Sequence, residues 1–182
     1  MLGRASAIER AGVVLLAVAA VGGCGGATDG GEAGRGEPGQ GPAGEEFVVH
    51  RAGGIEVTDP VITEPVAGGA GALYLRLANR SGESATLIGL WVDGADASLH
   101  RTETREGRSV MRPVEEIDLS PGAGVRLRPG GFHGMIRWSG EAAVAGDTVA
   151  VGLRFEGRPL VTVPAEVVNH AEALERHPPG GP

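Results

Sequence analysis

Two histidines and two methionines are spaced so that they could act together on a metal ion. The segment GGFHGMIRW, residues 130–138, places His133 and Met135 two positions apart. His100 and Met111 lie upstream, and these two methionines are the only ones after the initiator. A single strand histidine is usually an ordinary surface residue, and a single methionine usually fills a core. The pattern therefore leaves two readings open, core fragments or ligand pairs.

The upstream pair falls on a predicted hairpin. If residues 106–107, Glu-Gly, form its loop, His100 pairs with Pro113 and Thr102 pairs with Met111. His100 and Met111 are then diagonal neighbours, which long side chains can bridge. Two strand pairs, each with one imidazole and one thioether, could converge on one ion.

Short alternating runs position these residues. Apolar runs of about four to eight residues alternate with Gly, Pro, Asp or Asn from residue 46 onward, as in residues 71–79 and 147–156. Leu73, Leu75 and Leu77 should share one face of a strand. This pattern predicts an all-β domain, an antiparallel sandwich or barrel. Only the tail near residues 166–177 could add a helical turn or two.

The same alternation applies to residues 132–138. Phe132, Ile136 and Trp138 should face the core, which directs His133 and Met135 outward into a shallow site. Gly134 falls on the core side, where it lets a neighbouring group approach closely.

The N-terminus predicts export and a lipid anchor. Arg4 and Arg10 flank an apolar run that is too short to span a bilayer and is typical of a secretory signal. The run ends VGGC, which resembles the lipobox of bacterial lipoproteins and implies acylation of Cys24. Residues 25–45 are rich in glycine and predict a flexible tether. The alternative is a soluble exported protein cleaved nearby.

Charge and composition exclude several functions. A net charge of -7 argues against a nucleic-acid partner, and one cysteine excludes an internal disulfide. Glu115 and Glu116 are adjacent and would point to opposite faces of a strand, and no other carboxylate pair or Ser-His-Asp set stands out. We therefore expect a protein that is not an enzyme.

Taken together, the motifs resemble a known family. The spacing His100-x10-Met111-x21-His133-x-Met135 is similar to the copper-ligand signature of periplasmic copper chaperones of the PCu(A)C type, and the segments MRPVEEIDLSPG and LRPGGFHGM also resemble that family. The resemblance covers roughly residues 55–165. It implies a cupredoxin-like, Greek-key β-sandwich that binds one Cu(I) through these four residues and also tolerates Cu(II), because thioethers are soft ligands and imidazoles are less selective.

The resemblance also implies partners and a location. Copper would pass to the copper A centre of cytochrome c oxidase or to a thiol-containing copper chaperone, from a monomer anchored to the outer face of the membrane or in the periplasm. His170 and His177 are expected to be solvated rather than to form a second copper site. Copper sequestration for tolerance and a metal-free interaction module remain alternatives. The expected parts are a signal peptide (1–23), the lipidated Cys24 with its tether (24–45), a copper-binding domain (46–168) and a flexible tail (169–182).

Overall fold

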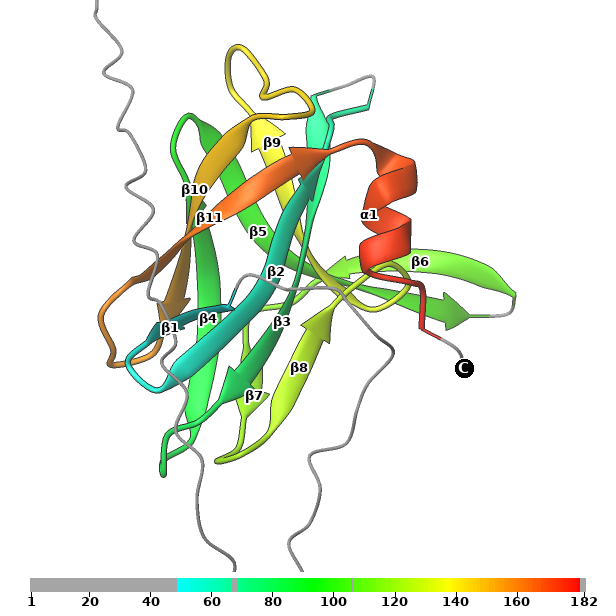
Figure 1. Ribbon diagram of the computed structural model, residues 1–182. Helices are drawn as coiled ribbons and strands as arrows, with labels where there is room; N and C mark the ends of the chain where they lie inside the picture. Colours follow the sequence, from blue (N-terminus) through cyan, green and yellow to red (C-terminus); the bar gives the residue numbers. More distant parts are fainter. Residues whose placement is uncertain (1–48, 67–68, 106, 181–182) are drawn as a thin grey trace, which may run out of the picture. The chain divides into compact units, whose positions relative to one another are not determined.

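The computed structural model describes residues 49–66, 69–105 and 107–180 (Figure 1). The predicted signal peptide, Cys24 and the tether lie outside these residues. Within them, no helix is long and apolar enough to cross a membrane.

Strands dominate the described chain, and one short helix follows them. In order they are β1 (Val49–Ala52), β2 (Ile55–Thr63), β3 (Ala70–Asn79), β4 (Ala85–Val92), β5 (Ala95–Arg105), β6 (Arg108–Pro113), β7 (Ile117–Leu119), β8 (Gly124–Leu127), β9 (Phe132–Trp138), β10 (Thr148–Phe155), β11 (Val161–Val168) and α1 (His170–Arg176). The all-β class predicted from the alternating pattern is confirmed.

The strands curl into a closed layer rather than two separate sheets. Hydrogen bonds connect β5-β9-β8-β3-β2-β11-β10-β4 in that order, and β4 also pairs with β5, which closes the ring. The other strands are added at its margins, β6 beside β5, β7 beside β4 and β1 beside β2. Most neighbouring strands run antiparallel, as expected, whereas β2 with β11 and β8 with β9 run parallel.

The ring encloses the main core as the alternation predicted. Leu73, Leu75 and Leu77 of β3 are fully or almost fully buried, and Leu153 and Phe155 of β10 join the same cluster. Burying each such side chain contributes roughly 1.5–3 kcal/mol. The core therefore fixes the register of the strands that carry the candidate ligands.

A second, smaller cluster lies on the other face of β3 and involves α1. Tyr74 packs there with Val61, Val168 and Ala173 of the helix. Asn169 begins the helix, its side chain accepting a hydrogen bond of 3.0 Å from the backbone N–H of Glu172. The predicted helical turns exist, but they pack on the domain, whereas a flexible tail was expected.

Ion pairs at Asp59 of β2 hold α1 in place. Asp59 has a φ of 55° where the β2–β3 register shifts, so its side chain leaves the strand pattern. Its carboxylate accepts hydrogen bonds from the Arg176 guanidinium, and the His177 Nε2–H donates to its backbone oxygen at 2.8 Å. His177 is buried, so its expected exposure to solvent is corrected by this docking.

Candidate metal centre

β5 and β9 bring the two candidate histidines together. His100 and His133 are direct cross-strand partners, and their rings are stacked with centroids 5.9 Å apart. The predicted hairpin register is also confirmed, since His100 pairs with Pro113 and Thr102 with Met111. All of these residues therefore lie within three adjacent strands, β6, β5 and β9.

His133 has one nitrogen fixed and one available. Its Nδ1 lies 3.1 Å from the Gly131 carbonyl, which can only accept, so Nδ1 carries a proton and, in the neutral ring, Nε2 carries the lone pair. Nε2 is buried and has no hydrogen-bond partner among the described residues. An imidazole oriented by a backbone carbonyl, with its second nitrogen unprotonated, is the form that binds a metal.

The burial of His133 corrects the expectation of a shallow, outward position. The side chain does face away from the main core, as the alternation predicted, but the residue is only 4% exposed. Residues of β3, the 129–130 loop and the start of α1 line the same hollow as His133. This burial depends on contacts between strands that are distant in the sequence. The period-two pattern of a single strand does not predict such contacts.

His100 offers a second nitrogen. Its Nε2 lies 3.0 Å from the Ser98 hydroxyl, and its Nδ1 is buried without a hydrogen-bond partner in the described structure. Burial lowers the pKa of His100 below its ordinary value, and the charges of Arg137 and of a protonated His133 ring act in the same direction. The ring is therefore neutral at pH 7, as a metal ligand must be.

The two thioethers border the same region. Met111, His133 and Met135 line one hollow of about 300 Å³, while Met135 and His100 line a second, adjoining hollow of about 200 Å³. Met135 is thus common to both. Met111 is 49% exposed, so the four candidate ligands range from buried to open.

Gly134 supports this arrangement from the core side. It pairs with Leu73 of β3 and Leu99 of β5, and a Cβ there would lie 2.6 Å from Leu90 Cδ1 and 2.9 Å from Leu73 Cβ. The close approach predicted at this glycine is confirmed, although the neighbours are leucines. β9 can therefore sit tightly between two strands while it presents His133 and Met135 on its other face.

One residue of the hollow was not expected. His170, at the start of α1, lines it together with Met111 and His133, although its own side chain is exposed. The sequence contains no signal for this position, because the docking of α1 depends on Asp59, more than a hundred residues away.

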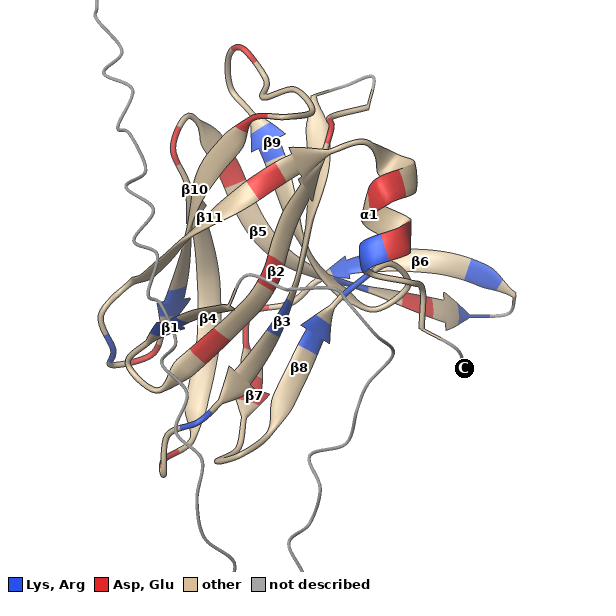
Figure 2. Ribbon diagram, viewed as in Figure 1, with Lys and Arg blue, Asp and Glu red and all other residues tan. Residues whose placement is uncertain are grey.

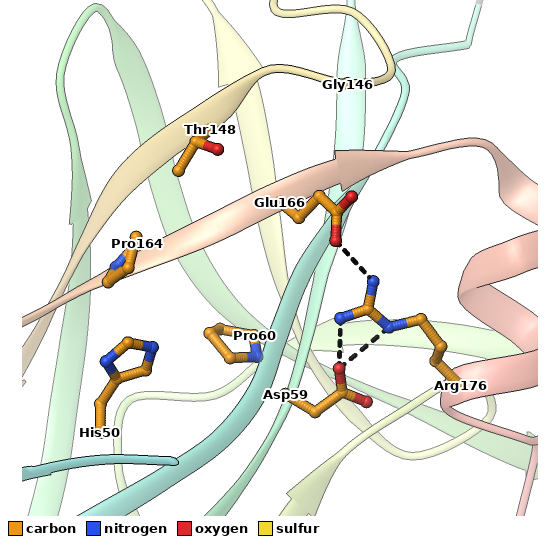
Figure 3. A pocket seen from close by; sticks show the side chains of 8 residues that line it. All are labelled: His50, Asp59, Pro60, Gly146, Thr148, Pro164, Glu166 and Arg176. Atoms are coloured by element: carbon orange, nitrogen blue, oxygen red, sulfur yellow. Dashed lines mark hydrogen bonds and ion pairs between the residues drawn. The ribbon is translucent and has the colours of Figure 1, made fainter. Parts of the chain in front are cut away.

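A separate hollow near His50 serves a different purpose. Figure 3 shows Arg176 between Asp59 and Glu166, with hydrogen bonds to both carboxylates and 2.8 Å to Glu166 Oε2. Burial raises the pKa of Asp59, but the hydrogen bonds from His177 and Arg176 and their charges outweigh it and leave that pKa lowered. The charges in this hollow satisfy one another, so we interpret it as the anchor of α1.

The donor types limit which metal could bind. In the part of the chain that the structure describes, no three His, Cys, Asp or Glu side chains come together to hold an ion. A metal at the His100–His133 pair would therefore need the thioethers, and sulfur donors of this kind select soft ions such as Cu(I).

Comparisons with known proteins give a family and a fold. The model of the family described as "LpqE-like: Putative lipoprotein LpqE-like" matches residues 55–167, more than half of the chain. A comparison with curated proteins finds no significant match.

Among solved structures, similar folds are PCuAC domains. "Copper-bound PCuAC domain from PmoF2" matches with a TM-score of 0.56 and 22% identity over 67% of this chain and 98% of that one. "Apo PCuAC domain from PmoF1" gives 0.56 and 18% over 67% and 99%, and "apo PmoF2 PCuAC domain" gives 0.53 and 24% over 69% and 95%. The fold implied by the sequence motifs is thereby confirmed.

Proposed function

This chain belongs to the LpqE-like lipoprotein family, and from that premise we propose that it is an exported copper chaperone anchored by lipid at Cys24. It binds one Cu(I) through His100, Met111, His133 and Met135. The PCuAC fold supports this assignment, since one of the similar domains is described as copper-bound.

The observation that carries the proposal is the state of the two imidazoles. His133 Nε2 and His100 Nδ1 are both buried and both lack a hydrogen-bond partner among the described residues. An unsatisfied buried polar atom costs about 1–3 kcal/mol, so two of them on neighbouring rings call for a ligand. Met135 borders both rings, and its sulfur suits Cu(I).

The same donor set suits an exported protein. Outside the cytoplasm, paired thiolates are prone to form a disulfide. Thioethers cannot cross-link, and they become sulfoxides only under stronger oxidation. Two imidazoles and two thioethers can therefore hold Cu(I) there without a reductant.

The unequal burial of the ligands supports delivery of copper over permanent storage. Met111 is half exposed, whereas His133 is covered. An incoming ligand could replace Met111 first and the buried ligands afterwards. We propose that the acceptor is the copper A centre of cytochrome c oxidase or a thiol-containing chaperone that serves it; sequestration for copper tolerance is the alternative function, because it needs the same site.

A Cu(I) titration against a chelator of known affinity tests the binding site. We expect one Cu(I) per chain, with X-ray absorption showing two sulfur and two nitrogen ligands. Met111→Leu with Met135→Leu should weaken binding at least tenfold, whereas His50→Ala, a histidine on β1, should leave it unchanged. Wild-type protein that takes up no Cu(I) would leave a metal-free interaction module as the explanation.

A deletion strain separates delivery from sequestration. Loss of oxidase activity that added copper restores supports delivery. Copper sensitivity with normal oxidase activity supports sequestration instead.

A further inference from the structure

The β5–β6 hairpin has two chemically different faces. It extends away from the rest of the domain (Figure 1), and its strands pair residue by residue from His100–Pro113 to Arg105–Arg108. Because side chains alternate, His100, Thr102 and Met111 share the face that borders the candidate metal centre. The opposite face carries Glu103, Val110 and four arginines: Arg101, Arg105, Arg108 and Arg112.

The arginines of this face stand directly opposite one another. Arg101 pairs with Arg112, and Arg105 pairs with Arg108. Figure 2 shows the basic positions along β6 and at the end of the hairpin. Like charges in direct cross-strand positions repel and destabilise a hairpin. Two such pairs on one short hairpin therefore lower the stability of the fold.

Partners within the chain compensate only part of this charge. Arg105 forms an ion pair of 3.3 Å with Glu103, and Arg101 lies 5.0 Å above the ring of Phe132. Neither Arg108 nor Arg112 has an ion pair among the described residues, and both are exposed. The face thus keeps a net positive charge on a chain whose total charge is -7.

The composition of the face indicates what it would bind. Guanidinium groups bind carboxylates through two parallel hydrogen bonds, and arginine is enriched in protein interfaces. Val110, half-buried between the arginine pairs, adds an apolar contact, whereas Glu103 would be repelled by an anionic membrane. A protein surface with several carboxylates and an apolar patch fits this mixture better than lipid headgroups do.

We propose that this face is the docking surface for an acidic protein partner that exchanges copper with the chain. This inference rests on the proposed function, because copper exchange is the reason for a partner to dock. The two faces share the same strands, so a partner seated on the arginines holds the hairpin that carries His100 and Met111. Docking and ligand exchange then occur at one structural element.

The test uses the full chain in neutral detergent and a fluorescent oligoglutamate peptide as the acidic probe. Fluorescence anisotropy should show saturable binding that weakens as salt is raised. Arg105→Gln with Arg108→Gln should weaken binding about fivefold, since each exposed charge contributes modestly. The matched control is Arg126→Gln with Arg154→Gln, two exposed arginines on β8 and β10, and it should change binding less than twofold.

Three results would overturn the proposal. These are no binding of the peptide, equal weakening of peptide binding by both double variants, and binding of phosphatidylglycerol vesicles through Arg105 and Arg108 without binding of the peptide. Cu(I) titration of the same variants is read separately and should match wild type. A chain that binds the peptide as expected but takes up no copper would contradict the proposed function and leave the docking surface intact.

Discussion

Replacing Gly134 by alanine tests whether the tight packing of β9 sustains the metal centre. An added Cβ would lie 2.9 Å from Leu73 Cβ, an atom attached directly to the backbone of the paired strand. The Leu90 methyl at 2.6 Å can rotate, but Leu73 Cβ can move only if β3 and β9 separate. The substitution therefore acts on the strand spacing beneath His133 and Met135.

The size of the effect follows from two opposing contributions. Overpacking of this kind costs about 1–3 kcal/mol. Replacing glycine in a strand returns about 0.5–1 kcal/mol, because glycine loses more conformational freedom on folding. We expect Gly134→Ala to lower the free energy of unfolding by about 1 kcal/mol, within limits of about 0 and 2.5 kcal/mol, and to weaken Cu(I) binding, since both ligands of β9 shift.

Gly89 of β4 provides a matched control. A Cβ at Gly89 would meet no atom within 4 Å, so Gly89→Ala should keep or slightly raise stability and leave Cu(I) binding unchanged. Urea denaturation of the apo proteins and Cu(I) competition titrations measure the two effects. If Gly134→Ala is as stable as Gly89→Ala and binds copper equally well, the close approach at Gly134 does not support the site.

Further predictions concern the anchor of α1, the mouth of the site and the lipid. Asp59→Asn should cost about 3 kcal/mol in urea denaturation, because Arg176 and His177 lose a buried carboxylate. The pKa of Asp59 is lowered by folding, so its contribution is complete at neutral pH and is lost as pH falls below about 4; the Asn variant should lack that part of the acid dependence. His170→Ala should change stability by less than about 0.5 kcal/mol and Cu(I) affinity by less than about twofold, and a tenfold loss would make it a further ligand. Cys24→Ser should abolish palmitate labelling and release the protein from membranes, whereas a soluble wild-type protein would refute the anchor.

Local patterns were sufficient to predict the strands and the hairpin. The pairing of Thr102 with Met111 follows from one turn and from period-two alternation, both of which are written in adjacent residues. The buried faces of β3 and β10 were predictable for the same reason, because alternation directs leucine and valine to one side. The side of β9 that carries His133 and Met135 also followed from it.

Features that depend on distant contacts were not predictable. The alignment of His100 with His133 requires β5 to lie beside β9, and the hollow that His133 lines also takes residues from β3 and from the start of α1. The buried state of His177 depends on Asp59, whose positive φ no residue pattern announces. These are properties of strand order, which a single sequence leaves open.

The margins of the sheet also bear on how the protein behaves when many copies are crowded together. The path of paired strands ends in β6 and β7, and end strands can recruit a strand from another molecule. β7 is only three residues long, which gives an incoming chain little to pair with. β6 ends in Pro113, which lacks an N–H, and it carries Arg108 and Arg112, so a second copy would meet both a missing donor and its own charge. The hairpin arginines thus also protect the fold from aggregation through the open edge of β6.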